Sequence, residues 1–307
     1  MDKIYDMLVV GGGPAGYTAA LYAARSGFTA AVLEKMTPGG QMVLTHQIDN
    51  YPGFELGIDG YSLAEQMRRG AERFGVETVL TQVESAQLSG KVKTVTTDRG
   101  TFRGRTVVIA TGASPRRLGI PAEEEMIGRG VSYCAACDGM FFRNKTVVVV
   151  GGGNSAVGDA LILSRIAKEV ILVHRRNTLR ATRIYHEQLQ KTENITLCME
   201  SAVEQLLGQE MVSGVVIRDL ATGESREVPC QGLFISVGRA PETGLFAGQL
   251  ELDEGGYIRA DETTRTAIDG VYAAGDVRTK LLRQVVTATA DGACAAHAAE
   301  EYLAHQD

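Results

Sequence analysis

Cys134 and Cys137 are the residues of this chain whose types and spacing point most directly to chemistry. They lie in the segment VSYCAACDGMFF, residues 131–142, and Asp138 directly follows the second cysteine. Two thiols in a CxxC pattern can close a small disulfide and activate one another. A carboxylate beside them can take or give the proton that each exchange moves. The alternative for Asp138 is a surface carboxylate that caps a turn.

Three interpretations of the cysteine pair compete: a zinc site, a pair of inert buried thiols, and a redox-active dithiol. A structural zinc site needs four ligands at short spacing, but Cys198, Cys230 and Cys294 are isolated and the nearest histidine in sequence is His174. The redox-active dithiol therefore fits best, and we expect no metal. The other three cysteines lie in apolar or alanine-rich surroundings, which predicts small core residues.

Composition limits the classes of protein to consider. The 307 residues are enough for about two domains, and an apolar fraction of 44% with a charged fraction of 22% is that of an ordinary soluble protein. No run approaches the roughly 18 apolar residues of a membrane helix, and the first residues lack the pattern of a signal peptide. We therefore expect a cytoplasmic protein. A net charge of −6 without a long basic run argues against nucleic acid as the main partner.

A glycine-rich turn follows the first apolar run, residues 5–10, and precedes a small-residue helix and a second strand at 29–35. Gly11, Gly13 and Gly16 keep the G-x-G-x-x-G spacing of a dinucleotide-binding βαβ unit. In such a unit one glycine makes the tight turn, one lets the backbone approach a pyrophosphate, and one packs the helix close to the strand. Glu34 stands 23 positions after Gly11, where an acid can bind both ribose hydroxyls.

The same pattern recurs between the strand predicted at 145–150 and the strand predicted at 170–174. Gly151, Gly153 and Ala156 take the places of the three glycines. His174 stands where the first unit has its acid, and two arginines, Arg175 and Arg176, follow it. Arginines there can bind a 2′-phosphate through charge-assisted contacts, whereas an acid would repel it. The second unit is therefore predicted to bind NADPH, although a solvated basic face is the alternative.

A flavin connects these parts chemically. Nicotinamide delivers a hydride, whereas disulfide reduction requires electron delivery to sulfur, and a flavin can do both. The first nucleotide is therefore predicted to be FAD. Pro/Gly-rich connectors near 115–121 and 239–244 predict an inserted domain, so that residues 1–114 and 244–307 form the FAD-binding domain and residues 115–243 the NADPH-binding domain with the CxxC.

Short motifs along almost the whole chain resemble those of the low-molecular-weight thioredoxin reductases. In order they are GGGPAG (11–16), PGGQ (38–41), NYPG (50–53), ATGA (110–113), CAACDG (134–139), GGGNSA (151–156), HRRNTLR (174–180), AAGD (273–276) and RQ (283–284). Several are generic when taken singly, but their order and spacing together are specific. One departure is that the family often has glutamates where this chain has Gly158 and Asp159.

The resemblance implies an α/β fold of two Rossmann-like, three-layer FAD/NAD(P)-binding domains, with the NADPH domain inserted into the FAD domain, and a homodimer. It implies that FAD contacts Gly11, Gly13, Pro14, Ala15, Gly16, Glu34, Gly40, Gln41, Asn50, Ala110, Thr111, Gly112, Gly275, Asp276, Arg283 and Gln284. It implies that NADPH contacts Gly151, Gly153, Asn154, Ser155, Ala156, His174, Arg175, Arg176 and Arg180. Cys137 would face the flavin and Asp138 would act as general acid and base, while the sulfur that first attacks the partner stays open.

The resulting hypothesis is a thioredoxin-disulfide reductase. Electrons pass from NADPH through FAD and the Cys134–Cys137 disulfide to the disulfide of thioredoxin or a similar small protein. A dithiol against the flavin blocks the face that nicotinamide needs, so the resemblance implies domain rotation between the half-reactions. The alternatives are a flavin-dependent dithiol oxidase of a small molecule, which would not need the arginine cluster, and a non-enzymatic nucleotide-binding redox sensor.

Overall fold

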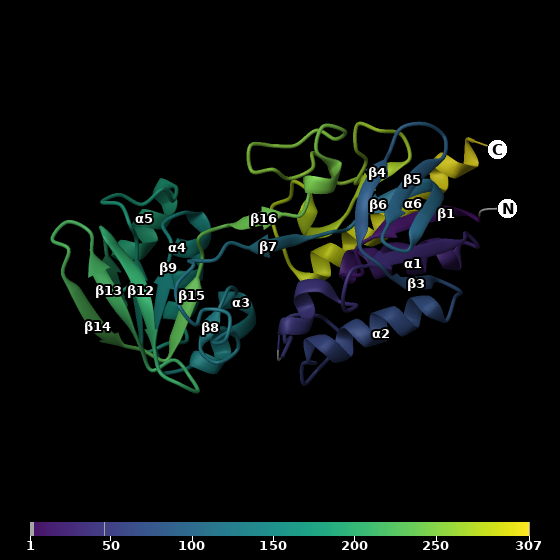
Figure 1. Cartoon of the computed structure of the whole chain (residues 1–307). Coiled ribbons are helices and arrows are strands. Elements are labelled where there is room, and N and C mark those ends of the chain that lie inside the picture. Colours follow the sequence, from purple (N-terminus) through teal and green to yellow (C-terminus); the bar gives the residue numbers. More distant parts are fainter. Residues whose placement is uncertain (1–2, 46, 307) are drawn as a thin grey trace. The chain divides into compact units, whose positions relative to one another are not determined.

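The computed structural model describes residues 3–45 and 47–306, and the chain forms two compact units (Figure 1). Unit 1 consists of Met1–Ser114 and Ala240–Asp307, and unit 2 consists of Pro115–Arg239. The sequence predicts an inserted domain over 115–243, whereas the contacts place residues 240–243 with unit 1. Which nucleotide each unit binds stays a prediction.

Unit 1 is built on a seven-stranded sheet with the order β3-β2-β1-β6-β5-β4, in which β17 also pairs with β6. Five strands run parallel: β1 (Ile4–Val10), β2 (Ala30–Glu34), β3 (Glu77–Leu80), β6 (Gly100–Ile109) and β17 (Val271–Ala273). Strand β5 (Lys93–Thr97) pairs in antiparallel fashion with β6 on one side and with β4 (Val83–Gln87) on the other. The long strand β6 thus pairs with β5 through its first half and with β1 and β17 through its second half.

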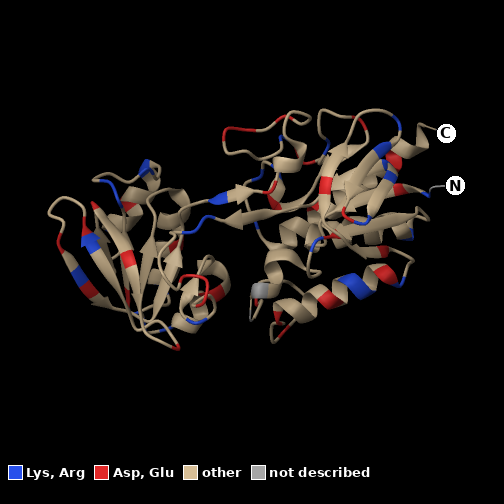
Figure 2. Cartoon of the chain, viewed as in Figure 1, with Lys and Arg blue, Asp and Glu red and all other residues tan. Residues whose placement is uncertain are grey.

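The α-helices in the described part of this unit are α1 (Pro14–Arg25), α2 (Gly60–Glu72) and α6 (Val285–Ala304). Short 3-10 helices are η1 (Gly40–Leu44), η3 (Gly244–Phe246) and η4 (Gly275–Val277). Alanines of α1 and α6 form one buried cluster with Met7 and Val9 of the sheet, because small side chains let the two helices approach closely. Helix α2 has alternating charges along one face, where Arg68 pairs with Glu65 and Glu72 (Figure 2).

Unit 2 contains a five-stranded parallel sheet with the order β11-β10-β9-β15-β8. Its strands are β8 (Val131–Ser132), β9 (Thr146–Val150), β10 (Glu169–Val173), β11 (Ile195–Cys198) and β15 (Gly232–Ile235). A three-stranded antiparallel sheet consists of β12 (Ser201–Leu207), β13 (Gly214–Asp219) and β14 (Ser225–Pro229). The helices are α3 (Ala135–Asp138), η2 (Gly139–Phe142), α4 (Asn154–Ser164) and α5 (Arg183–Gln190).

The central strands of unit 2 are apolar throughout because both of their faces are covered. Strand β9 reads TVVVV and β10 reads EVILV, the continuous pattern of a parallel sheet buried on two sides. One face packs against the three-stranded sheet and the other against α4 and α5, in two separate clusters. Both units therefore have the Rossmann-like α/β arrangement that the sequence predicts.

The chain passes between the units in two short strands. Strands β7 (Ala113–Pro115) and β16 (Arg239–Pro241) pair with each other in a two-stranded sheet. A proline ends each strand and restricts the backbone there. Glu242 follows β16 and accepts hydrogen bonds from the hydroxyls of Thr111, at 2.7 Å, and Ser114, at 2.7 Å. Within the described residues no helix combines the length and the apolar character that a membrane span requires.

Candidate functional site

The glycine turn of unit 1 has the backbone geometry of a nucleotide cradle. Gly11 lies at φ +106°, in the left-handed region that favours glycine. A Cβ on Gly16 would overlap the carbonyl oxygen of Gly11, so glycine is needed for close packing of α1. A Cβ on Gly13, in contrast, would meet no protein atom within 4 Å. The open space beside Gly13 is where the backbone can approach a bound phosphate.

Glu34 lies at the end of β2 beside this turn. Its Oε2 accepts a hydrogen bond from the Gly12 amide at 2.7 Å, and its Oε1 accepts one from the Met36 amide at 3.0 Å. The two bonds fix the carboxylate at the rim of the turn, next to the space that Gly13 leaves free. This is a suitable position for binding a ribose diol, and the assigned role stays a prediction.

Predicted FAD contacts in distant segments of unit 1 make hydrogen bonds and ring contacts within this unit. The Gly39 amide donates to the Gly12 carbonyl at 2.6 Å, which brings the PGGQ segment to the glycine turn. Asn50 donates through Nδ2 to Gln284 Oε1 at 3.0 Å, across 234 positions of sequence. Arg283 lies over the ring of Tyr257, with 4.0 Å from its guanidinium carbon to the ring centroid. The PGGQ segment therefore lies at the glycine turn, and two other predicted FAD contacts, Asn50 and Gln284, bind each other.

The turn that contains Gly275 and Asp276 is held by a buried ionic cluster that the sequence analysis missed. Asp291, which is 6% exposed on α6, accepts from the Gly275 amide at 2.8 Å. The same carboxylate binds Arg278 through Nε at 2.9 Å and Nη2 at 2.8 Å, and Lys280 through Nζ at 2.7 Å. Burial alone would raise the pKa of Asp291, but the hydrogen bonds from the two cations outweigh it and lower that pKa.

The second glycine turn, in unit 2, repeats the geometry of the first. Gly151 lies at φ +147°, and a Cβ there would overlap the Ser236 carbonyl oxygen. A Cβ on Gly153 would meet nothing within 4 Å. Ala156 is fully buried at the position where the first turn has Gly16. The residues of both turns therefore fit the dinucleotide that the pattern predicts.

His174 and the arginines that follow it have different environments. The His174 residue is 5% exposed and its ring lies directly under Gly152, where a Cβ would overlap it. Its Nε2 is buried and has no hydrogen-bond partner among the described residues. Burial, and then the charges of neighbouring arginines, lower the pKa of His174. The predicted phosphate-binding arginines Arg175 and Arg176 are exposed.

Asp159 is the residue by which α4 contacts the loop after β15. Its carboxylate accepts a hydrogen bond from the Ser236 hydroxyl, and burial raises the pKa of Asp159. Gly158 has no neighbour within 4 Å of an added Cβ, so a larger side chain would find room there. At the two positions where the family often has glutamates, this chain therefore has open space at Gly158 and a carboxylate, Asp159, that binds Ser236.

Cys134 and Cys137 form a disulfide at the start of the short helix α3, with 5.3 Å between their Cα atoms. Cys134 is the N-cap residue, and its sulfur accepts a hydrogen bond from the Cys137 amide at 3.2 Å. An amide donor aimed at sulfur favours the thiolate after reduction. Among the described residues no group of three or more His, Cys, Asp or Glu side chains is arranged to hold a metal ion.

Ser132 is a further residue of this centre that the sequence analysis did not identify. Its hydroxyl donates to Asp138 Oδ2 at 2.6 Å and accepts from the Cys134 amide at 3.1 Å. The hydroxyl therefore links the carboxylate of the predicted general acid and base to the backbone of Cys134. A hydroxyl two residues before the CxxC was the available sequence signal.

The prediction that the other cysteines are core residues is right only for Cys230, which is fully buried and whose pKa burial raises to about 12. Cys294 is exposed and Cys198 is half-buried. The prediction fails for Cys294 because α6 has alanines on several faces, so an alanine-rich setting does not distinguish the buried face from the exposed one.

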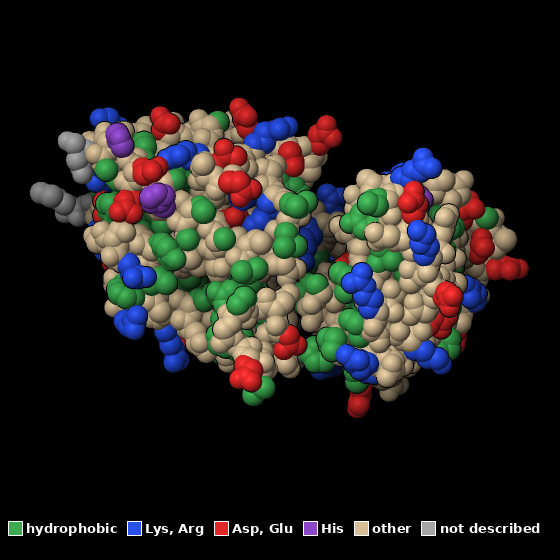
Figure 3. Space-filling view, turned by 180° about the vertical axis from the view of Figure 1, so that it is seen from behind, with side chains coloured by type: hydrophobic (Ala, Val, Ile, Leu, Met, Phe, Trp, Pro, Cys, Tyr) green, Lys and Arg blue, Asp and Glu red, His purple; other side chains and the backbone are tan. Residues whose placement is uncertain are grey.

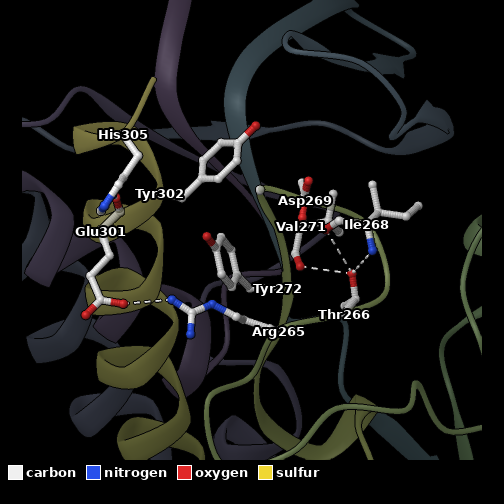
Figure 4. A pocket seen from close by; sticks show the side chains of 10 residues that line it. Arg265, Thr266, Ile268, Asp269, Val271, Tyr272, Glu301, Tyr302 and His305 are labelled. Carbon is white, nitrogen blue, oxygen red and sulfur yellow. Dashed lines mark hydrogen bonds and ion pairs between the residues drawn. The ribbon is translucent and has the colours of Figure 1, made fainter. Parts of the chain in front are cut away.

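A cavity of about 400 Å³ in unit 1 is separate from these sites (Figure 4). It lies beside β17 and the end of α6. Some of its polar groups bind one another: Arg265 pairs with Glu301 at 2.7 Å, and the Thr266 hydroxyl donates to the Val271 carbonyl at 2.9 Å. No residue that lines it is a predicted FAD or NADPH contact.

The sequence is similar to known proteins over almost its whole length. A sequence model of the family described as pyridine nucleotide-disulphide oxidoreductase matches residues 5–292. The chain is 46% identical to the thioredoxin reductase of Streptomyces clavuligerus, over 99% of this chain and 95% of that protein. It is 44% identical to the thioredoxin reductase of Treponema pallidum, over 99% of this chain and 98% of that protein.

Solved structures give the same result. The crystal structure of thioredoxin reductase from Streptococcus pyogenes matches with a TM-score of 0.92 at 43% sequence identity, and the match covers 99% of this chain and 100% of that one.

Proposed function

The chain belongs to the pyridine nucleotide-disulphide oxidoreductases, with thioredoxin reductases as its relatives, and we propose that it reduces the disulfide of thioredoxin with electrons from NADPH. The observation that carries the proposal is the Cys134–Cys137 disulfide, with Asp138 directly after it and hydrogen-bonded to Ser132. It lies in a chain that also has two glycine turns shaped for dinucleotides.

FAD and NADPH are the cofactors of this family, and the residues of this chain are suited to hold both. The first glycine turn with Glu34 would hold FAD, and the second turn with Arg175 and Arg176 would hold NADPH. When bound, the two supply hydride transfer from nicotinamide and delivery of an electron pair to sulfur. The unpartnered His174 Nε2 supports a ligand at the second turn, because a buried polar atom without a partner is costly.

The reduced cysteine pair carries out the exchange with the protein substrate. One thiolate attacks a sulfur of the partner's disulfide, and the partner's other sulfur leaves as a thiolate that takes up a proton. The second cysteine then attacks the mixed disulfide, which restores Cys134–Cys137 and releases the partner as a dithiol. Two electrons leave the pair. We propose that Asp138, which accepts a hydrogen bond from Ser132, takes and returns the proton that each step moves.

Exposed apolar side chains beside the disulfide support a protein as the substrate. Met140 is 51% exposed and Phe141 is 47% exposed, three and four positions after Cys137. Large apolar side chains in contact with water favour association with another protein. We propose that these two residues contact thioredoxin while its disulfide is reduced.

Movement of the units completes the proposed cycle. The chain crosses between the units only through the paired strands β7 and β16. Two neighbouring crossings can act as a hinge, since few backbone angles must change. We propose rotation about them, so that nicotinamide and the cysteine pair reach the flavin in alternate half-reactions.

Assembly and location are proposals of the same kind. We propose a homodimer formed through unit 1, where Leu56 and Leu281 are almost fully exposed. Hydrophobic side chains also gather on the face of this unit that Figure 3 shows on the left. A cytoplasmic location is supported by three free cysteines, which a reducing compartment keeps reduced.

The proposed activity is tested by mixing the purified flavoprotein with NADPH and oxidised thioredoxin. We expect catalytic NADPH oxidation with two new thioredoxin thiols for each NADPH, because the disulfide is a two-electron couple. Oxidation of a small dithiol by oxygen without any consumption of NADPH would favour the dithiol oxidase. A single turnover without further reaction would favour the redox sensor.

The NADPH assignment predicts a change of coenzyme preference. Replacing Arg175 and Arg176 by alanine should raise the KM for NADPH by about tenfold or more, because charge-assisted hydrogen bonds to the 2′-phosphate are lost. The KM for NADH, which lacks that phosphate, should change little. Arg183→Ala in exposed helix α5 is the matched control. Equal effects on NADPH and NADH would contradict the assignment.

A further inference from the structure

Glu123 is a buried carboxylate that the proposed reaction does not use. The residue is 3% exposed and lies in unit 2, in the loop between β7 and β8. Its Oε2 accepts from the amides of Gly119, at 2.8 Å, and Ile120, at 3.4 Å. Its Oε1 accepts from the Leu118 amide at 3.1 Å and from the Tyr133 hydroxyl at 2.6 Å. The carboxylate thus connects the loop that follows the first connector to the residue before Cys134.

Tyr133 makes this connection persistent. Burial, and then the hydrogen bond to Glu123, raise the pKa of Tyr133 above its ordinary value. The phenol therefore remains protonated at neutral pH and remains a donor to the carboxylate. Because Tyr133 directly precedes Cys134, its ring position restrains the backbone of the first redox cysteine.

The segment before Cys134 is held by backbone bonds at its start and by side-chain bonds at the two residues next to the cysteine. Strand β8 has two residues, and its one partner strand is β15. The Val131 amide also donates to the Met126 carbonyl at 3.0 Å. Side chains restrain the next two residues: Ser132 binds Asp138, and Tyr133 binds Glu123. Both side-chain contacts therefore involve the residues that directly precede Cys134.

The backbone next to Glu123 is strained, which supports a functional role for this turn. Ala122, the preceding residue, has φ +61°, in the left-handed region that is unfavourable for a residue with a Cβ. Such strain persists only where the surroundings determine the conformation, and it concentrates at functional sites. The four hydrogen bonds of Glu123 hold the strained turn in place.

We propose that Glu123 is a positioning residue for the redox-active disulfide. Acting through Tyr133, it holds Cys134 in place relative to Cys137 and Asp138. Glu123 also accepts hydrogen bonds from the amides of residues 118–120. It therefore connects the first segment of unit 2 to Tyr133. This inference rests on the proposed function. It assigns to the loop an effect on the cysteine pair that acts through Tyr133.

The test uses the holoenzyme in three variants: Glu123→Gln, Tyr133→Phe and the double variant. Glutamine places an NH2 group against N–H or O–H donors, so at least one bond is lost. Each single variant should lower kcat/KM for thioredoxin by about tenfold, since small displacements of reacting groups have effects of this order or larger. Flavin reduction by NADPH should be unchanged. The kcat/KM of the double variant should be no lower than that of the less active single variant, because both changes break the same connection.

Glu125→Gln is the matched control, because Glu125 is an exposed glutamate of the same loop. Additive losses in the double variant, or wild-type kcat/KM in Glu123→Gln, would overturn the proposal. A parallel loss of flavin reduction would also overturn it, since that pattern indicates general damage. If Glu123→Gln does not fold, Tyr133→Phe alone tests the proposal, because it removes only one hydroxyl. Its kcat/KM for thioredoxin is then compared with that of the wild type.

The redox equilibrium of the disulfide with dithiothreitol provides a second readout that does not need thioredoxin. We expect Glu123→Gln to make the disulfide several-fold easier to reduce, because the bonds that hold its geometry are weakened. Failure of the wild type with thioredoxin would refute the proposed function and leave this measurement standing. An unchanged equilibrium constant would refute the role of Glu123.

Discussion

Replacement of Cys137 by serine is expected to abolish the reduction of thioredoxin while leaving NADPH able to reduce the flavin. The serine hydroxyl cannot form a disulfide with Cys134, so the electron pair has no sulfur pair to enter. We expect turnover with thioredoxin to fall by at least about a thousandfold, the scale on which loss of a catalytic nucleophile acts. Cys134→Ser should have the same effect, because both sulfurs form the single disulfide.

Cys294→Ser is the matched control for this prediction. It makes the same exchange of thiol for hydroxyl at an exposed position of α6. Stopped-flow absorbance, which follows flavin reduction, and the thioredoxin assay should both give wild-type rates for this variant. A reductive titration adds a second readout: the wild type should take up two electrons more per flavin than either catalytic variant. Wild-type turnover in Cys137→Ser would contradict the assignment of the redox centre.

Replacement of Asp291 by asparagine is expected to cause the largest loss of stability. Asp291 is a nine-tenths buried carboxylate that balances Arg278 and Lys280, whose side chains are 4% and 6% exposed. Removing the negative charge leaves two buried cations without a counter-charge, which destabilises by about 3–5 kcal/mol. Because Asp291 also binds the Gly275 amide, the variant should release FAD at a lower urea concentration.

Flavin fluorescence during urea unfolding measures this loss. Glu262→Gln is the control, because Glu262 is an exposed carboxylate that acts on Arg278 only through its charge, and it should change the midpoint little.

The stabilisation by Asp291 should depend on pH. Because the folded-state pKa of Asp291 is lowered, its contribution to the free energy of unfolding is complete at neutral pH. That contribution is lost as the pH falls below about 4, the pKa of an unfolded aspartate. The difference between the variant and the wild type should therefore shrink in acid.

The two nucleotide units could be predicted from sequence because their signals are local. Strand, glycine turn and helix follow one another within about 30 residues, and Glu34 and His174 stand at equal distances after Gly11 and Gly151. The structure places both side chains against the second residue of their turns, Gly12 and Gly152. Position in the repeat was therefore sufficient to locate them.

Contacts between distant segments could not be predicted in the same way. Glu123 begins a run of three glutamates, and composition alone does not show which of the three is buried. The partners of Asp291 follow strand β17, on a segment that the helical pattern of α6 does not specify. Both cases depend on tertiary packing, which selects one polar residue among several similar ones.

The most direct test of the electron path is an anaerobic experiment that follows flavin absorbance. NADPH is added first to the purified yellow protein, and oxidised thioredoxin is added second. We expect bleaching by NADPH and then recovery of the yellow colour as thioredoxin is reduced, with no recovery in Cys137→Ser. Recovery in that variant, or a wild-type flavin that stays bleached in the presence of oxidised thioredoxin, would contradict the path through Cys134 and Cys137.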